Sequence, residues 1–388
     1  MKRVRDFSGI QMNATSALLL LVLDLTITSC GDSPLQGENH SAGYIYKEPT
    51  RISDGWEVSS LDTMRVEVKR ILREVENIRN GIYPEIHSFL VISKGKLILE
   101  EYFPGHNSSG SLINYGRDIP HEVQSASKSY RSALIGIAID RGYIQSVDSK
   151  MFSFFPEYAQ LSDERKEKIT LHHLLTMSSG LDWDEWSYSY NDPRNTLRGM
   201  YQLPYAQWTS YFLSRPIAFE PGTRWNYNTG TENMLNGIII KAIDISFADF
   251  VKHYLSDPLE CTRLPGVGNP LGGETTPRDM AKFGYLYLND GQWKGKQVVS
   301  KAWIEKSTTK YFQLDRIESY GYQWWLRNYS SSKATYASFY ASGNGGQYII
   351  AIKDLDLVIV FTGGNFNNGQ GMSLPFSIVE NSVIPAFE

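Results

Sequence analysis

The sequence has few cysteines, little net charge and no long apolar run. Its 388 residues include 2 cysteines, Cys30 and Cys261, and carry a formal net charge of -4 at pH 7. Basic and acidic residues are mixed along the chain, so no basic stripe exists to hold a phosphate backbone, and nucleic acid is not an expected partner. Hydrophobic residues make up 41% of the chain, which is enough to bury a substantial core.

The first thirty residues are typical of an export signal. Three basic residues lie among the first five, and an apolar stretch covers residues 17–23, far fewer than the ~20 residues that a spanning helix needs. Residues 27–30 (ITSC) resemble the lipobox at which bacterial lipoproteins are cut. We therefore expect residues 1–29 to be a lipoprotein signal peptide and Cys30 to carry the lipid. Asp24 fits this pattern poorly, and the alternative is an unprocessed N-terminus.

This signal has consequences for location and stability. We expect an exported protein, anchored through Cys30 to a bacterial membrane on its periplasmic or cell-surface side. Lipidation of Cys30 leaves Cys261 without a disulfide partner, so stability must come from the core. Residues 30–50 are rich in glycine, serine and proline and predict a flexible tether between the anchor and the folded body.

Hydrophobic periodicity predicts a chain with β-rich ends and an α-rich middle. Helices are expected over residues 61–78, 125–142 and 277–290, the last one opened by Thr276 and Pro277. Strands are expected over 347–352 and 357–361, and a hairpin over 88–103. From residue 150 to about 254 the pattern is mainly helical. The sequence shows no internal repeat.

A serine and a lysine three residues apart open the helix predicted over 125–142. Positions i and i+3 share a helical face, so Lys128 can reach the hydroxyl of Ser125. Acyl transfer by a serine needs a base of this kind, and a lysine serves as a base only when its pKa is depressed, so the site should be enclosed. The same spacing recurs where no helix with a buried face opens, at Ser93/Lys96, Ser307/Lys310 and Ser330/Lys333.

Four stretches carry a family resemblance. They are residues 124–129 (QSASKS) before 133–138, residues 169–181, residues 221–230 (PGTRWNYNTG) and residues 342–347 (SGNGGQ). Together they resemble the serine beta-lactamase and penicillin-binding protein family of the class C type, including its esterase and 6-aminohexanoate-dimer hydrolase branches. The match runs from roughly residue 89 to 362, with the motifs in the family's order.

The resemblance implies a fold and a set of roles. The fold is α/β (α+β), with an antiparallel sheet flanked by helices from residues 51–149 and 255–388, and an inserted mainly helical domain over 150–254. Ser125 would be the nucleophile and Lys128 the base or proton relay. Tyr227 would be the second proton-transfer group and would share one proton with the lysine. The resemblance implies neither a cofactor nor a metal ion.

Residues 342–347 are expected to complete the site. By the resemblance, the backbone N–H groups of Ser125 and Gln347 form the oxyanion hole. Glycines at this turn, namely Gly343, Gly345 and Gly346, let a ligand approach the backbone closely. By themselves these glycines are equally typical of a plain hairpin turn.

The chain departs from the family pattern at two positions expected to bind substrate. Thr229 replaces the asparagine of the family's Tyr-x-Asn motif, so a hydroxyl replaces an amide. Asn344 stands where relatives have lysine or histidine and supplies no charge for a substrate carboxylate. We therefore rank cleavage of an ester or simple amide above β-lactam hydrolysis, although Arg224 or another cation could compensate.

Other side chains have plainer interpretations. His172 and His173 lack a second histidine at zinc-site spacing, so we interpret them as surface or packing residues rather than metal ligands. Asp182, Asp184 and Glu185 are interpreted as a solvated acidic loop, with substrate contact as the alternative. The aromatic runs 183–190 and 320–325 are interpreted first as core material and second as the lining of an apolar cleft.

Three functions remain open on the sequence. The first is a serine esterase or amidase that cleaves a small ester, amide or peptide-like substrate through an acyl-enzyme on Ser125. The second is a non-catalytic or slowly acylating sensor of cell-wall fragments. The third is a true beta-lactamase or D,D-peptidase.

Overall fold

The computed structural model describes residues 44–64, 66–265 and 273–388, and residues 44–388 form one compact unit. The expected signal peptide, Cys30 with its expected lipid, and most of the expected tether lie outside the described residues. Residues 44–50 have no regular secondary structure. In the described part of the chain, no helix combines the length and the apolar character that crossing a membrane requires.

A nine-stranded sheet forms the centre of the fold, in the order β1-β3-β2-β15-β14-β13-β12-β11-β10. Its pairs are antiparallel except β1 with β3, which is parallel. The strands are β1 Glu57–Val58, β2 Ile86–Ser93, β3 Lys96–Tyr102, β10 Phe312–Gln313, β11 Glu318–Tyr320, β12 Trp325–Ser330, β13 Thr335–Gly343, β14 Gln347–Ile352 and β15 Leu357–Gly363. Strands from both ends of the chain therefore meet at the β2–β15 pair.

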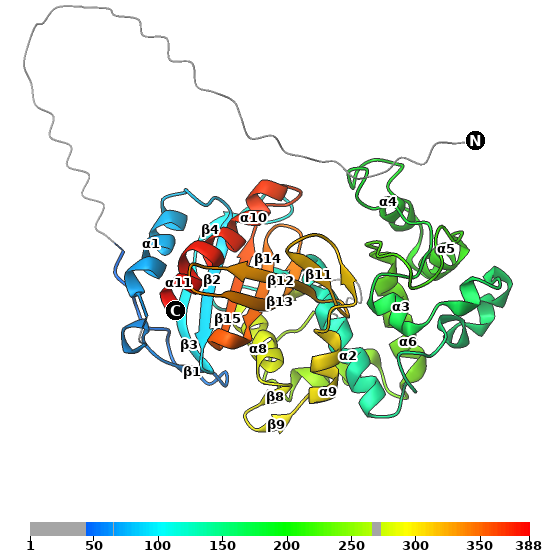
Figure 1. Cartoon of the computed structure of the whole chain (residues 1–388), viewed down its shortest axis with the longest axis horizontal. Coiled ribbons are helices and arrows are strands. Elements are labelled where there is room, and N and C mark those ends of the chain that lie inside the picture. The colour runs from blue at the N-terminus through cyan, green and yellow to red at the C-terminus, as the bar shows by residue number, and fades with distance from the viewer. Residues whose placement is uncertain (1–43, 65, 266–272) are drawn as a thin grey trace, which may run out of the picture. The chain divides into compact units, whose positions relative to one another are not determined.

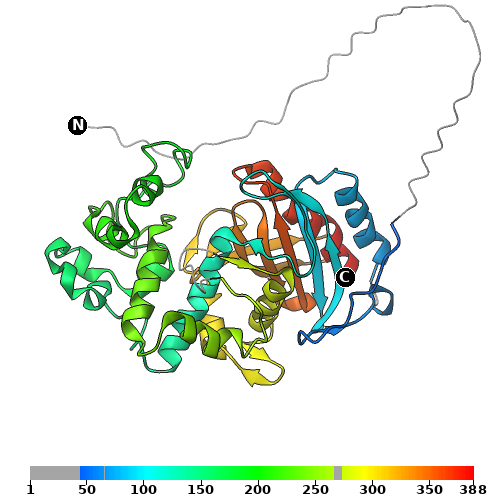
Figure 2. The ribbon, with the colours of Figure 1, turned by 180° about the vertical axis from the view of Figure 1, so that it is seen from behind.

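Helices cover both faces of this sheet (Figures 1 and 2). In β15, Val358 and Val360 belong to the core cluster shared with α2 and α8, whereas Ile359 and Phe361 belong to the cluster shared with α1, α10 and α11. Alternate residues of a strand point to opposite faces, so a strand buried on both faces is apolar throughout. The covering helices are α1 Val68–Arg79, α2 Ser127–Asp140, α8 Pro277–Leu288, α10 Gly369–Ile378 and α11 Ile384–Phe387.

Residues 150–254 contain helices and turns but no strand. The α-helices are α3 Leu171–Leu175, α4 Thr196–Tyr201, α5 Trp208–Ser214, α6 Gly230–Ala242 and α7 Phe247–Val251. The short helical turns of this region are Met151–Phe154, Pro156–Leu161, Lys166–Lys168, Tyr205–Gln207 and Lys252–Ser256. This region is helical as expected. Its separation as an independent domain with boundaries at 150 and 254 stays a prediction, because it belongs to the same compact unit as the sheet.

The remaining elements are short. Three small antiparallel pairs are β4 Pro104–His106 with β5 Leu112–Asn114, β6 His121–Glu122 with β7 Glu274–Thr275, and β8 Gln292–Trp293 with β9 Lys296–Gln297. Helix α9 covers Lys301–Ser307, and single helical turns lie at Leu61–Thr63, Gln124–Ala126, Lys353–Leu355 and Val379–Val383. The pair β6–β7 matters for the site because β6 ends just before the turn that carries Ser125.

The sequence-based elements agree with the structure apart from some boundaries. Thr276 accepts a hydrogen bond from the backbone N–H of Asp279 at 3.2 Å, which makes it the N-cap of α8 with Pro277 in the first turn. The helix expected over 61–78 begins at Val68, because residues 61–63 form a separate turn. The expected antiparallel sheet flanked by helices is confirmed, with the parallel edge strand β1 as the one exception among the described strands.

Candidate active site

The candidate nucleophile Ser125 lies in the turn Gln124–Ala126, which leads directly into α2. The ammonium of Lys128 donates a hydrogen bond to the hydroxyl oxygen of Ser125 at 3.0 Å. Lys128 is 4% exposed, whereas Ser125 is half-buried and lines a cavity. The predicted pair therefore meets, with the amine enclosed and the hydroxyl within reach of a ligand.

Two backbone features hold Ser125 in place. Gln124 adopts a left-handed φ of 50°, which is uncommon for a residue with a Cβ and turns the chain just before the serine. Gly343, at the end of β13, packs on the carbonyl of Val123, and a Cβ at residue 343 would lie 2.2 Å from that oxygen. Glycine at 343 therefore lets the sheet edge approach the turn that carries Ser125.

Lys128 carries its proton more firmly than the sequence predicted. Burial by itself lowers the pKa of Lys128, but the acidic groups of Tyr227, Glu232 and Glu185 outweigh burial and raise the pKa above the ordinary value of 10.5. The expectation of a depressed pKa was wrong, because acidic side chains surround the enclosed amine. A lysine with a raised pKa is an ammonium at neutral pH, so Lys128 donates to the Ser125 oxygen and has no lone pair to accept its proton.

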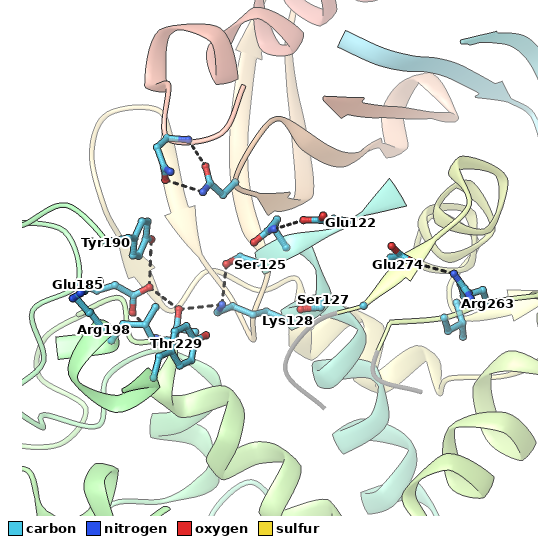
Figure 3. A pocket seen from close by; sticks show the side chains of 17 residues that line it. Glu122, Ser125, Ser127, Lys128, Glu185, Tyr190, Arg198, Thr229, Arg263 and Glu274 are labelled. Atoms are coloured by element: carbon cyan, nitrogen blue, oxygen red, sulfur yellow. Dashed lines mark hydrogen bonds and ion pairs between the residues drawn. The ribbon is translucent and has the colours of Figure 1, made fainter. Parts of the chain in front are cut away.

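Thr229 links Lys128 to a buried carboxylate. The ammonium donates to the Thr229 hydroxyl at 3.3 Å, and that hydroxyl donates to Oε1 of Glu185 at 2.6 Å. Glu185 also accepts a hydrogen bond from the backbone N–H of Thr229 at 2.8 Å and from the indole of Trp183 at 3.0 Å. Figure 3 shows the resulting chain of hydrogen bonds from Ser125 through Lys128 and Thr229 to Glu185.

The interpretation of Glu185 as part of a solvated loop was wrong. Glu185 is 3% exposed, whereas Asp182 is exposed and binds Arg215. Every second residue from Leu181 to Glu185 is buried, and the residues between them are more exposed. This alternation, with leucine, tryptophan and glutamate on one side, was the sequence signal that could have identified Glu185.

Tyr227 lies beside Lys128, within an aromatic cluster. The lysine Nζ lies 5.2 Å from the centroid of the Tyr227 ring, and Trp186 stacks on that ring at 4.7 Å. Trp325 stacks on it at 6.2 Å. The Tyr227 hydroxyl makes no hydrogen bond with any residue that the structure describes. The structure thus brings the three predicted residues together around the ammonium, while the proton-transfer role of Tyr227 stays a prediction.

The aromatic runs 183–190 and 320–325 contain both buried core residues and an exposed residue beside the site. Trp183, Tyr320, Tyr322 and Trp324 are buried in the core. Trp186, in contrast, is 56% exposed and covers Tyr227.

A cavity of about 750 Å³ opens over Ser125 and lies within the size range of small-molecule sites. Of the residues that the sequence assigned to the site, Ser125, Lys128, Thr229 and Asn344 line this cavity. The others, Tyr227, Gly345, Gly346 and Gln347, are not among its lining residues. Sequence analysis had not identified several other lining residues, which include Glu122, Glu185, Tyr190, Arg198, Tyr201, Arg263 and Glu274. No local pattern distinguishes these residues, because they come from separate segments.

The turn between β13 and β14 closes one end of the site. Asn344 exchanges two hydrogen bonds with Asn367, donating to its side-chain oxygen at 2.9 Å and accepting from its backbone N–H at 2.8 Å. Gly345 and Gly346 have φ values of 95° and 96°, a conformation that L side chains rarely adopt. The buried side chain of Gln347 donates to the carbonyl of Gly363 at 2.6 Å and ties β14 to β15. The expected oxyanion role of the Gln347 backbone N–H stays a prediction.

Three other basic residues considered on the sequence lie outside the cavity lining. His173 closes the capping box of α3 with Thr170, and His172 is hydrogen-bonded to the hydroxyl of Tyr322 at 2.7 Å. Both histidines therefore have structural roles: His172 packs against Tyr322, and His173 caps α3. Arg224 is exposed and lies over the ring of Phe219, 4.4 Å from its centroid.

Known proteins resemble this chain in sequence and in fold. A 6-aminohexanoate-dimer hydrolase of Paenarthrobacter ureafaciens is 24% identical over 236 residues, covering 56% of this chain and 56% of that protein. A solved structure described as a putative 6-aminohexanoate-dimer hydrolase from Bacillus anthracis superposes with a TM-score of 0.65 at 20% identity, covering 89% of this chain and 91% of that one. A family VIII carboxylesterase gives a TM-score of 0.59 at 16% identity, covering 82% and 97%. At these identities the two structures establish the fold.

The family model described as Beta-lactamase matches residues 86–371. This range contains β2, the Ser125 turn, the helical region, Tyr227 and the turn at Asn344. It ends within α10, so it takes in all the strands that border the cavity. On this match the chain belongs to the beta-lactamase family.

Proposed function

We propose that the protein is a serine hydrolase that cleaves an ester or an amide through an acyl-enzyme on Ser125. The observation that carries the proposal is the hydrogen bond of 3.0 Å between the Lys128 ammonium and a Ser125 hydroxyl that opens to a cavity. The relatives named as hydrolases and as a carboxylesterase support a hydrolytic reaction of this type.

The proposed reaction has two halves. In the first, the Ser125 oxygen attacks the carbonyl carbon of the substrate, its proton passes into the Lys128–Tyr227 pair, and the leaving group departs with a proton from that pair. In the second, a water molecule gives its proton to the same pair and attacks the acyl-enzyme, which frees the acid and restores the Ser125 hydroxyl. The backbone N–H groups of Ser125 and Gln347 are proposed to stabilise the oxyanion in both halves.

The protonated state of Lys128 defines its part in this scheme. As an ammonium it cannot accept the Ser125 proton, so the proposed acceptor is the Lys128–Tyr227 pair after this pair has lost one proton. Lys128 lies 5.2 Å from the centroid of the Tyr227 ring and donates to the Ser125 oxygen, so it connects the two hydroxyl-bearing residues. The Glu185 carboxylate, reached through Thr229, balances the charge of the ammonium.

Labelling with a fluorophosphonate probe tests the proposal directly. The wild-type protein is expected to be labelled at Ser125 and to hydrolyse p-nitrophenyl esters, whereas Ser125→Ala should show neither property. Ser127→Ala is a matched control, because this hydroxyl also lines the cavity but has no lysine three residues later. Equal labelling of wild type and Ser125→Ala would overturn the proposal.

A beta-lactamase or D,D-peptidase activity and a sensor role are the alternatives. A β-lactam carries a carboxylate, and the neutral amide of Asn344 supplies no charge for it and is already hydrogen-bonded to Asn367. We therefore expect slow hydrolysis of nitrocefin beside rapid turnover of esters. Stable acylation without turnover would instead support the sensor role.

We also propose that the protein is exported and held at a bacterial membrane by a lipid on Cys30. The proposal rests on the basic N-terminus, the short apolar stretch and the ITSC sequence at 27–30. Expression in bacteria fed radiolabelled palmitate tests it. Wild type should incorporate the label and fractionate with membranes, and Cys30→Ala should do neither. Equal labelling of the two proteins would contradict the proposal.

A further inference from the structure

We infer that Arg198 forms a subsite for a carboxylate group on the substrate. The inference rests on the proposed function and adds a substrate class to it, namely esters or amides that carry a carboxylate away from the reacting carbonyl. Arg198 is the third residue of α4, in the first turn after the N-cap Asn195, and it lines the cavity above Ser125.

Among the described cations that line the cavity, Arg198 alone has no side-chain partner. Lys128 donates to Ser125 and to Thr229. Arg263 forms an ion pair of 2.7 Å with Glu274, which lies in the same lining. Lys128 and Arg263 therefore already have partners within the protein, whereas the positive charge of Arg198 is available to a ligand.

Arg198 is half-buried, and its Nε is fully buried without a hydrogen-bond partner in the described part of the chain. A cation at a cavity wall that has no protein partner is available to a ligand, and the terminal nitrogens of the guanidinium, which unlike Nε are not fully buried, are the atoms that a ligand in the cavity would reach. Asp192 is close enough for Arg198 to contribute to its depressed pKa, after the larger contribution of Arg194. The Asp192 carboxylate is already bound by Arg194 at 2.7 and 3.0 Å.

The position of Arg198 is preorganised. Asn195 is buried, and its side-chain oxygen accepts hydrogen bonds from the backbone N–H groups of Leu197 and Arg198 at 3.0 and 3.3 Å. Its side-chain nitrogen donates to the carbonyls of Glu185 and Tyr188, both at 2.9 Å. One side chain thus fixes both α4 and the segment that holds Glu185. Figure 3 draws Arg198 with Glu185, Tyr190 and Thr229, and draws Arg263 and Glu274 on the other side of Lys128.

The chemistry of the site favours a carboxylate over other anions. The planar guanidinium matches a carboxylate with two parallel hydrogen bonds. Three acidic residues, Glu122, Glu185 and Glu274, line the same cavity and disfavour a group with two negative charges such as a phosphate. Asn344 stands at the family's cationic position but binds Asn367. Arg198 therefore supplies, from the helical wall, the charge that Asn344 does not.

The test uses matched pairs of substrates that differ only in a carboxylate. For the acyl side, the p-nitrophenyl monoester of adipic acid is compared with p-nitrophenyl hexanoate. For the leaving-group side, 4-acetoxybenzoate is compared with its methyl ester. Wild type is expected to prefer the anionic member of one pair, chiefly through a lower KM. The preference is measured as the kcat/KM of the anionic substrate divided by that of its neutral partner. In Arg198→Gln this ratio should fall at least tenfold, and Arg198→Lys should keep part of the preference.

Arg224→Gln is the matched control. It removes the same charge from an exposed residue of the loop that carries Tyr227, outside the cavity lining, and should leave the ratio unchanged. The inference is overturned if wild type prefers neither anionic substrate, if the preference survives in Arg198→Gln, or if this variant loses both members of a pair equally. If Arg224→Gln lost the preference, Arg224 rather than Arg198 would bind the substrate carboxylate, and the inference would also be overturned.

This outcome can be separated from failure of the proposed function. If Ser125 is labelled and neutral esters are hydrolysed, but Arg198→Gln does not alter the ratio, the subsite is refuted and the serine mechanism stands. If Ser125→Ala hydrolyses the esters as fast as wild type, the serine mechanism itself is refuted.

Discussion

Thr229 binds the carboxylate of Glu185 with two hydrogen bonds, from its backbone N–H at 2.8 Å and from its hydroxyl at 2.6 Å. Because the hydroxyl proton points to Glu185, the oxygen lone pairs are free to accept from Lys128 at 3.3 Å. A hydroxyl is both donor and acceptor, so it fits between an ammonium and a carboxylate. The departure from the family's asparagine is thus part of a connected network around the candidate base.

The Thr229 hydroxyl can be removed with almost no change in shape. Thr229→Val leaves one Glu185 oxygen without its strongest donor and takes an acceptor from Lys128. A hydrogen bond to a charged group is worth about 1.5–3 kcal/mol, so kcat/KM should fall roughly 10- to 100-fold. Ester hydrolysis by purified variants measures this effect. Thr229→Ser keeps the hydroxyl and should stay within a few-fold of wild type, and equal losses in both variants would contradict the prediction.

The role of the Tyr227 hydroxyl can be separated from that of its ring. Tyr227→Phe keeps the stacking with Trp186 and removes a hydroxyl that makes no hydrogen bond with the described residues. Its melting temperature should therefore match that of wild type. If the hydroxyl transfers a proton, kcat should fall by about 10²- to 10⁴-fold. An unchanged kcat would remove Tyr227 from the mechanism.

The charge on Lys128 predicts an alkaline pH dependence. Because the pKa of Lys128 is raised above 10.5, Lys128 keeps its proton through neutral pH. The proposed active form of the Lys128–Tyr227 pair has one proton fewer, so kcat/KM should rise with pH and show no plateau below the pKa of an ordinary lysine. The rates should be corrected with Ser125→Ala as the blank. A plateau near pH 7 would contradict this prediction.

Removing the charge of Glu185 should move that profile. Glu185 is one of the acidic groups that raise the pKa of Lys128, so Glu185→Gln lowers this pKa and should shift the rising limb to lower pH. The raised pKa of Lys128 also contributes to the stability of the fold. This contribution is fully present below pH 10.5, the ordinary pKa of lysine, and is lost as the pH rises through the higher pKa of the folded protein. Glu185→Gln should therefore lose this contribution at a lower pH than wild type. Asp182→Asn, an exposed acid of the same segment, should leave the limb in place.

The close approach of Gly343 to Val123 can be tested by adding one methyl group. In Gly343→Ala the new Cβ would lie 2.2 Å from a backbone oxygen, which cannot move without displacing the turn that holds Ser125. Overpacking of this kind costs about 1–3 kcal/mol, and labelling of Ser125 should slow as well. Gly116→Ala, where a Cβ would meet nothing within 4 Å, should have neither effect. Normal labelling of Gly343→Ala would show that the contact does not position the nucleophile.

Patterns along the chain were sufficient for the elements and for the pairing of Ser125 with Lys128, whereas Tyr227 was assigned through the family resemblance. The mostly apolar run at 347–352 and the apolar run at 357–361 are strands buried on both faces, and the Ser125/Lys128 spacing brings both side chains together where the turn Gln124–Ala126 leads into α2. The other Ser-x-x-Lys matches have no such setting. Ser93 and Lys96, for example, are paired residues at the end of the β2–β3 hairpin. Helical and strand periods are local properties, so a single sequence reveals them.

The sequence by itself determined that this is an α/β protein with a helical middle region, and that Lys128 can reach Ser125 from the same helical face. Only the tertiary structure decided that Glu185 is buried against Thr229, 44 positions away, and that Arg198 faces the same cavity without a partner. It also decided the charge of Lys128, because a pKa depends on every acid that packs around the amine. Local spacing tells where side chains point along one element, whereas these contacts depend on how separate segments fold together.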